Sequence, residues 1–114
     1  MKRTATCHIV SIKQHYDPSE PTRVVEIKIR CERTGLVRAF VEPDYGVLRH
    51  FEVEPTGKDF GKVAYSLVEA YLAKQGCQEV SLTAISPRVE HFWRTLGFIG
   101  HVEMRKNITH KKGA

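Results

Sequence analysis

The sequence predicts an α/β domain in which helices pack on a mixed, largely antiparallel sheet. Its 114 residues are enough for a single domain with one hydrophobic core. Apolar and polar residues alternate through the first half, which is typical of strands, whereas apolar residues recur at helical spacing after Pro55. Sequential strands followed by a strand–helix–strand crossover predict the mixed sheet.

Four strands are expected before Pro55. Weak alternation over residues 6–13 predicts the first strand. The second is the clearest, because every other residue is apolar and the residues between are charged. A tight turn at 33–35 leads into a third strand over 36–41, so these two strands should form a hairpin. The turn at 43–46 precedes a strand over 47–53. The apolar residues of the second strand are Val25, Ile27, Ile29 and Cys31.

A long amphipathic helix should follow. It is expected to begin near Gly61, with Asp59 or Thr56 as its cap, and to end at Gly76. Its apolar stripe recurs every three or four residues, as in a helix packed on a sheet. The stripe consists of Val63, Ala64, Leu67, Val68, Tyr71 and Leu72.

The remaining residues predict a strand, a short helix and a final strand. Residues 79–85 form an apolar run that is typical of a buried strand. Ser86 and Pro87 are favoured as the cap and first residue of a helix, and Gly97 is expected to end it. A last strand is expected over residues 98–104. Residues 107–114 are expected to form a basic, flexible tail.

Charge and hydropathy narrow the classes of function. Eighteen Lys and Arg against thirteen Asp and Glu give a formal charge of +5, which favours anionic partners. The basic residues cluster only at the two ends of the chain, so charge alone does not define a nucleic-acid binder, and nucleic acid remains an alternative partner. No apolar run is long enough to span a membrane, so an integral membrane protein and a membrane partner are not expected.

The cysteines and histidines are scattered. Cys7, Cys31 and Cys77 are far apart and odd in number, so they cannot all form disulfides within the chain, and reduced thiols are the simplest interpretation. The N-terminus lacks the apolar stretch of a secretory signal, which predicts a cytoplasmic protein. Because no two potential ligands have the spacing of a metal site, no metal is expected.

One segment favours an anion site. Residues 51–62 lead from a strand through a glycine-containing turn into the long helix. The first backbone N–H groups of a helix have no partner within it, and the helix dipole favours an anion there. Gly57 and Gly61 allow close approach, and Lys58 and Lys62 add positive charge. The functional interpretation is a pyrophosphate cradle, and the alternative is an ordinary strand-to-helix turn.

This order of elements resembles the GNAT superfamily of N-acetyltransferases, from about residue 36 to 104. The turn of that family carries a Q/R-x-x-G-x-G/A signature, which aligns here with residues 56–61. Gly61 matches, whereas Thr56 replaces the leading Gln/Arg and Asp59 replaces the central glycine. A second family motif ends a helix with Leu/Phe–Gly–Phe, and residues 96–98 match it. In the family, the tyrosine of that motif is often the general acid that protonates the thiolate of coenzyme A as it leaves. Trp93 occupies this position in the present chain.

The resemblance implies a GNAT-like fold, acetyl-CoA as co-substrate and an amine as acceptor. The amine attacks the thioester carbonyl, strand N–H groups polarise that carbonyl, and a base removes the amine proton. Glu52, Glu54 and His50 are the candidate bases; the alternative for each is a solvent-facing strand residue. The resemblance assigns cofactor binding to Phe51, Val53, Thr56, Gly57, Lys58, Asp59, Phe60, Gly61, Lys62, Phe92 and Trp93.

The acceptor side should be minimal. Family members usually carry one or two helices after the first strand, whereas residues 15–22 are too few for a proper helix. An open acceptor side suits a macromolecular amine acceptor, or a wall supplied by a second subunit in a homodimer. The alternative is a non-catalytic GNAT-like module that binds a protein or nucleic acid. Asp59, Trp93 and the short connection favour that alternative.

Overall fold

The computed structural model of the chain describes residues 6–15, 18–32, 34–54 and 60–109. In chain order its elements are β1 (Cys7–His15), β2 (Val24–Cys31), β3 (Gly35–Glu42), β4 (Val47–Glu54), α1 (Phe60–Lys74), β5 (Glu79–Thr83), α2 (Pro87–Thr95), β6 (Ile99–His101) and β7 (Glu103–Asn107). The strands form one sheet of order β1-β2-β3-β4-β5-β7-β6, in which only β4 and β5 are parallel. The predicted α/β class with a mixed, largely antiparallel sheet is confirmed.

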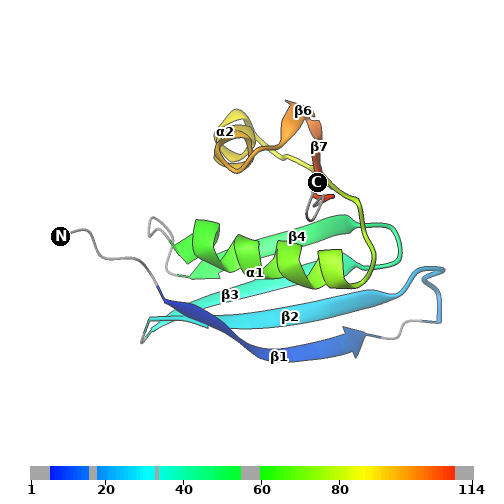
Figure 1. The fold of residues 1–114 in the computed structure, drawn as a ribbon, viewed down its shortest axis with the longest axis vertical. Coiled ribbons are helices and arrows are strands. Elements are labelled where there is room, and N and C mark those ends of the chain that lie inside the picture. The colour runs from blue at the N-terminus through cyan, green and yellow to red at the C-terminus, as the bar shows by residue number, and fades with distance from the viewer. Residues whose placement is uncertain (1–5, 16–17, 33, 55–59, 110–114) are drawn as a thin grey trace, which may run out of the picture.

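The first four strands bury one face of the sheet against α1. They form an antiparallel meander, and the predicted hairpin is confirmed because Cys31 lies opposite Gly35 at the turn between β2 and β3. Helix α1 packs against β1, β2 and β3, and it crosses this half of the sheet in Figure 1. The fully buried residues at this interface are Ile27, Ile29, Cys31, Val37, Ala39 and Val41 of the sheet and Ala64, Val68 and Leu72 of α1.

Helix α2 begins as the sequence predicts. Ser86 is its cap, and its Oγ accepts a hydrogen bond from the backbone N–H of Val89 at 3.2 Å. Pro87 is the first helical residue, and Gly97 follows the helix with a φ of 100°, a conformation that favours glycine. In Figure 1, α2 stands beside β6 and β7, away from the β1–β3 end of the sheet.

The expected single strand over residues 98–104 is wrong. The chain forms β6 and β7, an antiparallel pair in which His101 lies opposite Glu103. Val102, with a φ of 64°, occupies the turn, and Gly100 has a φ of 117°. The apolar pattern of residues 98–104 does not predict this turn, because valine normally disfavours the left-handed backbone that Val102 adopts here.

The expected flexible tail over residues 107–114 is wrong in its first part. Asn107 belongs to β7, and the backbone N–H of Ile108 donates a hydrogen bond to the Gln78 carbonyl at 2.9 Å. The Ile108 side chain is only 2% exposed. Its burial follows from the pairing of β7 with β5, which places the residues after β7 beside those before β5. Residues 110–114 lie outside the described part of the chain.

The expectation of reduced thiols is wrong for two of the three cysteines. Cys7 and Cys31 face each other in the β1–β2 register and form a disulfide. The spacing of Cys7 and Cys31 in the sequence does not predict this disulfide, because only the β1–β2 register brings the two residues together. Cys77 is the free cysteine, and its Sγ donates a hydrogen bond to the Pro43 carbonyl at 3.0 Å. Burial raises the pKa of the Cys77 thiol.

Within the described ranges, no helix combines the length and the apolar composition that crossing a membrane requires.

Candidate functional site

The two parallel strands at the centre of the sheet diverge. Val47 and Ser81 are the paired residues of β4 and β5, and the Ser81 N–H donates a hydrogen bond to the Gly46 carbonyl at 2.8 Å. Strand β4 then continues to Glu54, and no further pairing with β5 occurs along these two fully described strands. The edge of β4 that faces β5 therefore offers backbone groups without a ladder partner.

A cleft of about 160 Å³ occupies this divergence. Helix α2 closes one side of the cleft, and the walls combine apolar side chains with strand backbone. Its lining includes Leu48, His50 and Phe51 of β4, Thr83 of β5, and Val89 and Trp93 of α2.

Five aromatic rings fill the space behind the cleft. They connect β4, α1, α2 and the residue that follows Gly97, with ring centroids 4.8 to 6.4 Å apart. The five are Phe51, Tyr65, Phe92, Trp93 and Phe98. Trp93 is only 5% exposed and belongs to the core. Three residues assigned to cofactor binding, Phe51, Phe92 and Trp93, thus lie together, and two of them, Phe51 and Trp93, line the cleft.

Gly61 lies where α1 approaches α2. A Cβ on this residue would be 3.1 Å from the Phe92 ring and 3.6 Å from Val53 Cγ2, so glycine permits the close contact between the two helices. Phe60 is buried, and Lys62 is exposed in the first turn of α1. The other predicted cradle residues, which include both candidate caps, lie outside the described residues; they are Thr56, Gly57, Lys58 and Asp59.

The three candidate bases differ in their relation to the cleft. His50 lines it, and the His50 ring lies 5.9 Å from the Phe40 ring. Glu52 is exposed and lies 4.0 Å from Arg38. Glu54 is exposed at the end of β4. Of the three, the geometry brings only His50 to the cleft.

Arg49 was missed by sequence reasoning. It is the extra residue of a bulge in β4, because Phe40 pairs with His50 whereas the next residue, Val41, pairs with Leu48. Its guanidinium contacts Glu42 through Nε at 3.2 Å and Glu20 through Nη2 at 3.4 Å. No glycine or proline marks the bulge, so the sequence carries no signal for it.

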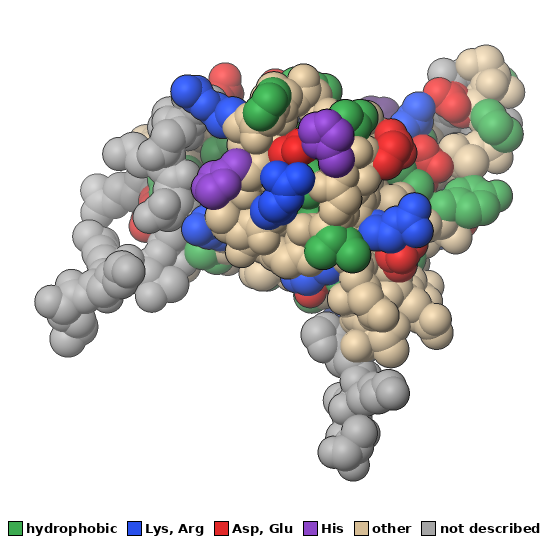
Figure 2. All heavy atoms as spheres, turned by 90° about the horizontal axis from the view of Figure 1, so that it is seen from above, with side chains coloured by type: hydrophobic (Ala, Val, Ile, Leu, Met, Phe, Trp, Pro, Cys, Tyr) green, Lys and Arg blue, Asp and Glu red, His purple; other side chains and the backbone are tan. Residues whose placement is uncertain are grey.

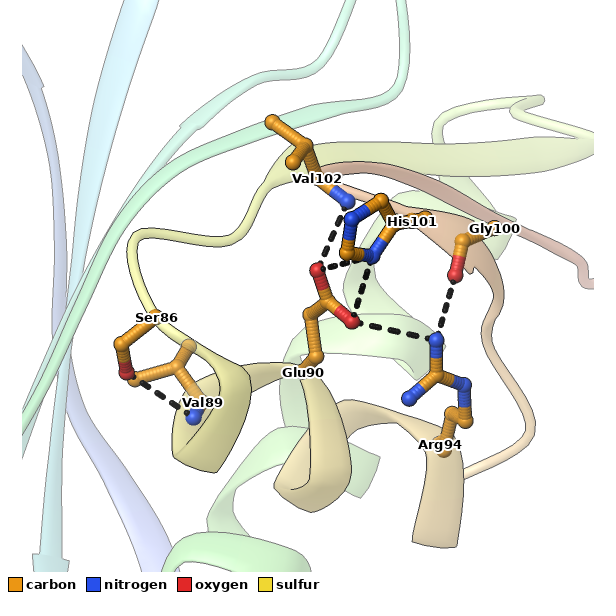
Figure 3. Close-up of polar contacts among 7 residues, drawn as sticks. All are labelled: Ser86, Val89, Glu90, Arg94, Gly100, His101 and Val102. Carbon is orange, nitrogen blue, oxygen red and sulfur yellow. Dashed lines mark hydrogen bonds and ion pairs between the residues drawn. The ribbon is translucent and has the colours of Figure 1, made fainter.

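A buried carboxylate anchors the turn between β6 and β7 to α2. Glu90 is 5% exposed, and its Oε2 accepts a hydrogen bond from the Val102 N–H at 2.9 Å. His101 Nδ1 lies 2.8 Å from Oε2, and Arg94 Nη2 lies 3.1 Å from Oε1 (Figure 3). The Val102 N–H, and then His101, hold the pKa of Glu90 below its usual range. Figure 2, which views the molecule from above relative to Figure 1, shows a face on which charged, histidine and hydrophobic side chains are mixed.

A second buried carboxylate lies on the sheet face opposite α1. Glu26 is 8% exposed, and its Oε1 lies 3.0 Å from His15 Nε2. The Arg38 Nε donates a hydrogen bond to Oε2 at 2.9 Å. The hydrogen bond with His15, followed by that from Arg38, lowers the pKa of Glu26. Sequence reasoning missed this cluster as well, because strand register creates it.

In the part of the chain that the structure describes, no group of three or more His, Cys, Asp or Glu residues could hold a metal ion. No protein-family model, curated protein or solved structure matches this chain.

Proposed function

We propose that this chain is an acetyl-CoA-dependent N-acetyltransferase that binds the thioester in the cleft between β4 and β5. The divergence of these two strands carries the proposal. The pantetheine arm of acetyl-CoA is extended and carries amide groups. Such a ligand pairs with a free strand edge, here that of β4, through main-chain hydrogen bonds. The cleft then takes the acyl end, where backbone N–H groups of β4 polarise the thioester carbonyl.

The transfer proceeds by direct attack. The lone pair of a neutral amine forms the new N–C bond at the thioester carbon, and the C–S bond breaks as the CoA thiolate leaves. His50 lines the cleft and takes the amine proton, directly or through one water. The indole N–H of Trp93 supplies no acid, so the thiolate is protonated by water.

The start of α1 supports the other end of the co-substrate. The first backbone N–H groups of α1 have no partner within the helix, and Lys62 is exposed beside them. An anionic pyrophosphate fits there. Asp59 and Lys58 belong to the same segment, outside the described residues.

Thermal unfolding with acetyl-CoA tests the proposal. At a hundredfold excess over the dissociation constant, binding should add about 2.7 kcal/mol to the free energy of unfolding and raise Tm. Val89→Trp should abolish the shift, because the larger side chain fills the cleft. Val10→Trp makes the same change at an exposed position of β1 and should keep the shift. The absence of any shift for the unmodified protein at millimolar acetyl-CoA would contradict the proposal.

A non-catalytic acyl-CoA-binding module is the second candidate. One observation favours it: among the described residues that line the cleft, Arg49 and His50 are the ionisable ones. The cleft therefore offers few groups for acid–base catalysis. His50→Gln separates the two functions. An enzyme loses about 10²-fold or more in kcat and keeps its affinity for acetyl-CoA. A protein that binds acetyl-CoA and transfers nothing to any amine is the module.

A further inference from the structure

The disulfide between Cys7 and Cys31 lies at the end of the sheet where α1 begins. Cys7 is the first residue of β1 and Cys31 is the last residue of β2. Next to the disulfide, the Glu32 N–H donates a hydrogen bond to the Thr6 carbonyl at 2.8 Å. Figure 1 shows the start of β1 and the start of α1 at this same end of the sheet. The disulfide therefore closes the open end of the β1–β2 hairpin beside the first turn of the helix.

Phe60, the first residue of α1, packs against this end of the sheet. Gly35 pairs with Cys31 across the β2–β3 hairpin. A Cβ on Gly35 would collide with the Phe60 ring and would lie 2.7 Å from the Cys31 carbonyl oxygen. Glycine therefore leaves the space over β3 that the Phe60 ring fills, one strand away from the disulfide. Cys31 is 0% exposed and Phe60 is 7% exposed, so both belong to the core around Gly35.

Strand β1 has few buried side chains to hold it in place. It is the edge strand of the described sheet, and seven of its nine side chains are exposed. The other two, Cys7 and Ile9, are half-buried against the core. Edge segments with few buried apolar groups open locally at a low cost in free energy. The start of β1 therefore depends strongly on its covalent bond to Cys31.

We propose that this disulfide is a redox switch: its reduction separates the start of β1 from β2 and loosens the first turns of α1. Cys7 is half-buried whereas Cys31 is fully buried, so the thiolate of a dithiol reductant attacks the Cys7 sulfur. The S–S bond breaks, and Cys31 leaves as a thiolate that takes up a proton. The second thiol of the reductant then displaces Cys7 as a thiol. Two electrons and two protons pass to the protein, and the dithiol becomes a disulfide.

Reduction changes the fold locally. No side chain of β1, a strand that the structure describes completely, is fully buried, so the core of β2, β3 and α1 persists when the start of β1 separates. The separation uncovers Cys31 and removes support from the Phe60 ring. Because Phe60 begins α1, the first turns of the helix then open more often.

The consequence for acetyl-CoA rests on the proposed function, in which the first N–H groups of α1 hold the pyrophosphate. A helix end binds an anion best when its N–H groups are already in place, because ordering them on binding costs free energy. The reduced protein should therefore bind acetyl-CoA more weakly than the oxidised protein.

Hydrogen exchange measured by NMR tests the switch without any ligand. Three amides are compared before and after reduction with dithiothreitol. The Glu32 N–H bonds across the open end of the hairpin, the Ala64 N–H belongs to the start of α1, and the Ser81 N–H bonds at the distant β4–β5 junction. Exchange at Glu32 and Ala64 should rise about tenfold more than exchange at Ser81. Equal rises at all three amides, or no rise, would overturn the switch, and a rise at Glu32 alone would overturn its connection to α1.

Cysteine variants separate the redox effect from other effects of the reductant. Cys7→Ser should exchange at Glu32 and Ala64 as the reduced protein does and should no longer respond to dithiothreitol. Cys77→Ser leaves the disulfide intact and should keep the full response. If Cys7→Ser does not fold, the unmodified protein is reduced and then reoxidised, which should restore slow exchange. A response to dithiothreitol that persists in Cys7→Ser, or that reoxidation does not reverse, would overturn the switch.

Calorimetric titration with acetyl-CoA separates this inference from the proposed function. The dithiothreitol is removed first, because a thiol attacks the thioester. The oxidised protein should bind about tenfold more tightly than the reduced protein. Equal affinities would uphold the co-substrate site and overturn its control by the disulfide. Failure of both forms to bind would contradict the proposed function, and the exchange measurements would still decide whether the disulfide is a switch.

Discussion

The carboxylate of Glu90 on α2 accepts a hydrogen bond from the backbone N–H of Val102, at 2.9 Å, and so fixes the turn between β6 and β7 to the helix (Figure 3). Arg94 adds a contact to the same carboxylate and donates a second hydrogen bond to the Gly100 carbonyl at 2.9 Å. Because α2 also closes the cleft, this carboxylate links the C-terminal strands to the candidate site.

Glu90→Gln should lower Tm at pH 7, because the neutral amide loses the charge-assisted contacts with Arg94 and His101. The pKa of Glu90 is lowered in the folded protein, so its contribution exists above the ordinary glutamate pKa of about 4.3. The contribution is lost as the pH falls through the lowered pKa. The difference in Tm between the two proteins should therefore shrink on acidification, as measured at pH 7 and pH 3. A pH-independent difference would contradict this origin.

The disulfide between Cys7 and Cys31 should stabilise the folded chain by limiting the freedom of the unfolded one. The two residues are 24 positions apart, and a loop of that size corresponds to about 3–4 kcal/mol. Cys7→Ser should lower the free energy of unfolding by about that amount, whereas Cys77→Ser, which leaves the disulfide intact, should cost less. Thiol titration of the denatured, unreduced protein should find one free thiol. Three free thiols would contradict the pairing.

Periodicity and capping chemistry predict much of the fold. The alternation of Val25, Ile27 and Ile29 identifies the buried face of β2, and the spacing of Ala64, Val68 and Leu72 identifies that of α1. Ser86 is followed directly by proline, and both occupy the predicted positions at the start of α2. These signals are local, since each depends on residues within one element.

The features that the sequence does not predict arise between elements. The divergence of β4 from β5, the disulfide and the buried carboxylates Glu26 and Glu90 all depend on strand register or on packing at a distance. The local sequence does not mark Arg49 as a bulge residue or Val102 as a turn residue. Both conformations follow from the pairing of strands in the complete sheet. The candidate bases show the same limit: His50, Glu52 and Glu54 alternate on one strand, and packing brings only His50 to the cleft.

Tyr65→Phe should stabilise the protein. The Tyr65 side chain packs among the aromatic rings behind the cleft, and its buried hydroxyl has no hydrogen-bond partner among the described residues. Burial raises the pKa of this phenol. Removal of an unpaired buried hydroxyl, with the ring kept, should raise the free energy of unfolding by about 1 kcal/mol in urea titrations. Tyr71→Phe, at a half-buried position of the same helix, is the control, and a clear loss for Tyr65→Phe would contradict the prediction.

Gly46→Ala should weaken the junction from which the cleft opens. The Gly46 carbonyl accepts the hydrogen bond from Ser81, its φ is 67°, and a Cβ there would collide with the Glu79 carbonyl oxygen. Gly76 has a φ of 96° with open space around its Cβ position, so Gly76→Ala measures the backbone strain alone, about 1–2 kcal/mol. The collision at Gly46 should add about 1–3 kcal/mol, because the β4 and β5 backbones must move apart. In urea titrations, Gly46→Ala should lose more free energy of unfolding than Gly76→Ala, and its Tm shift with acetyl-CoA should be weaker. Equal losses for the two variants would contradict the prediction, because the junction would then accept the added Cβ without cost.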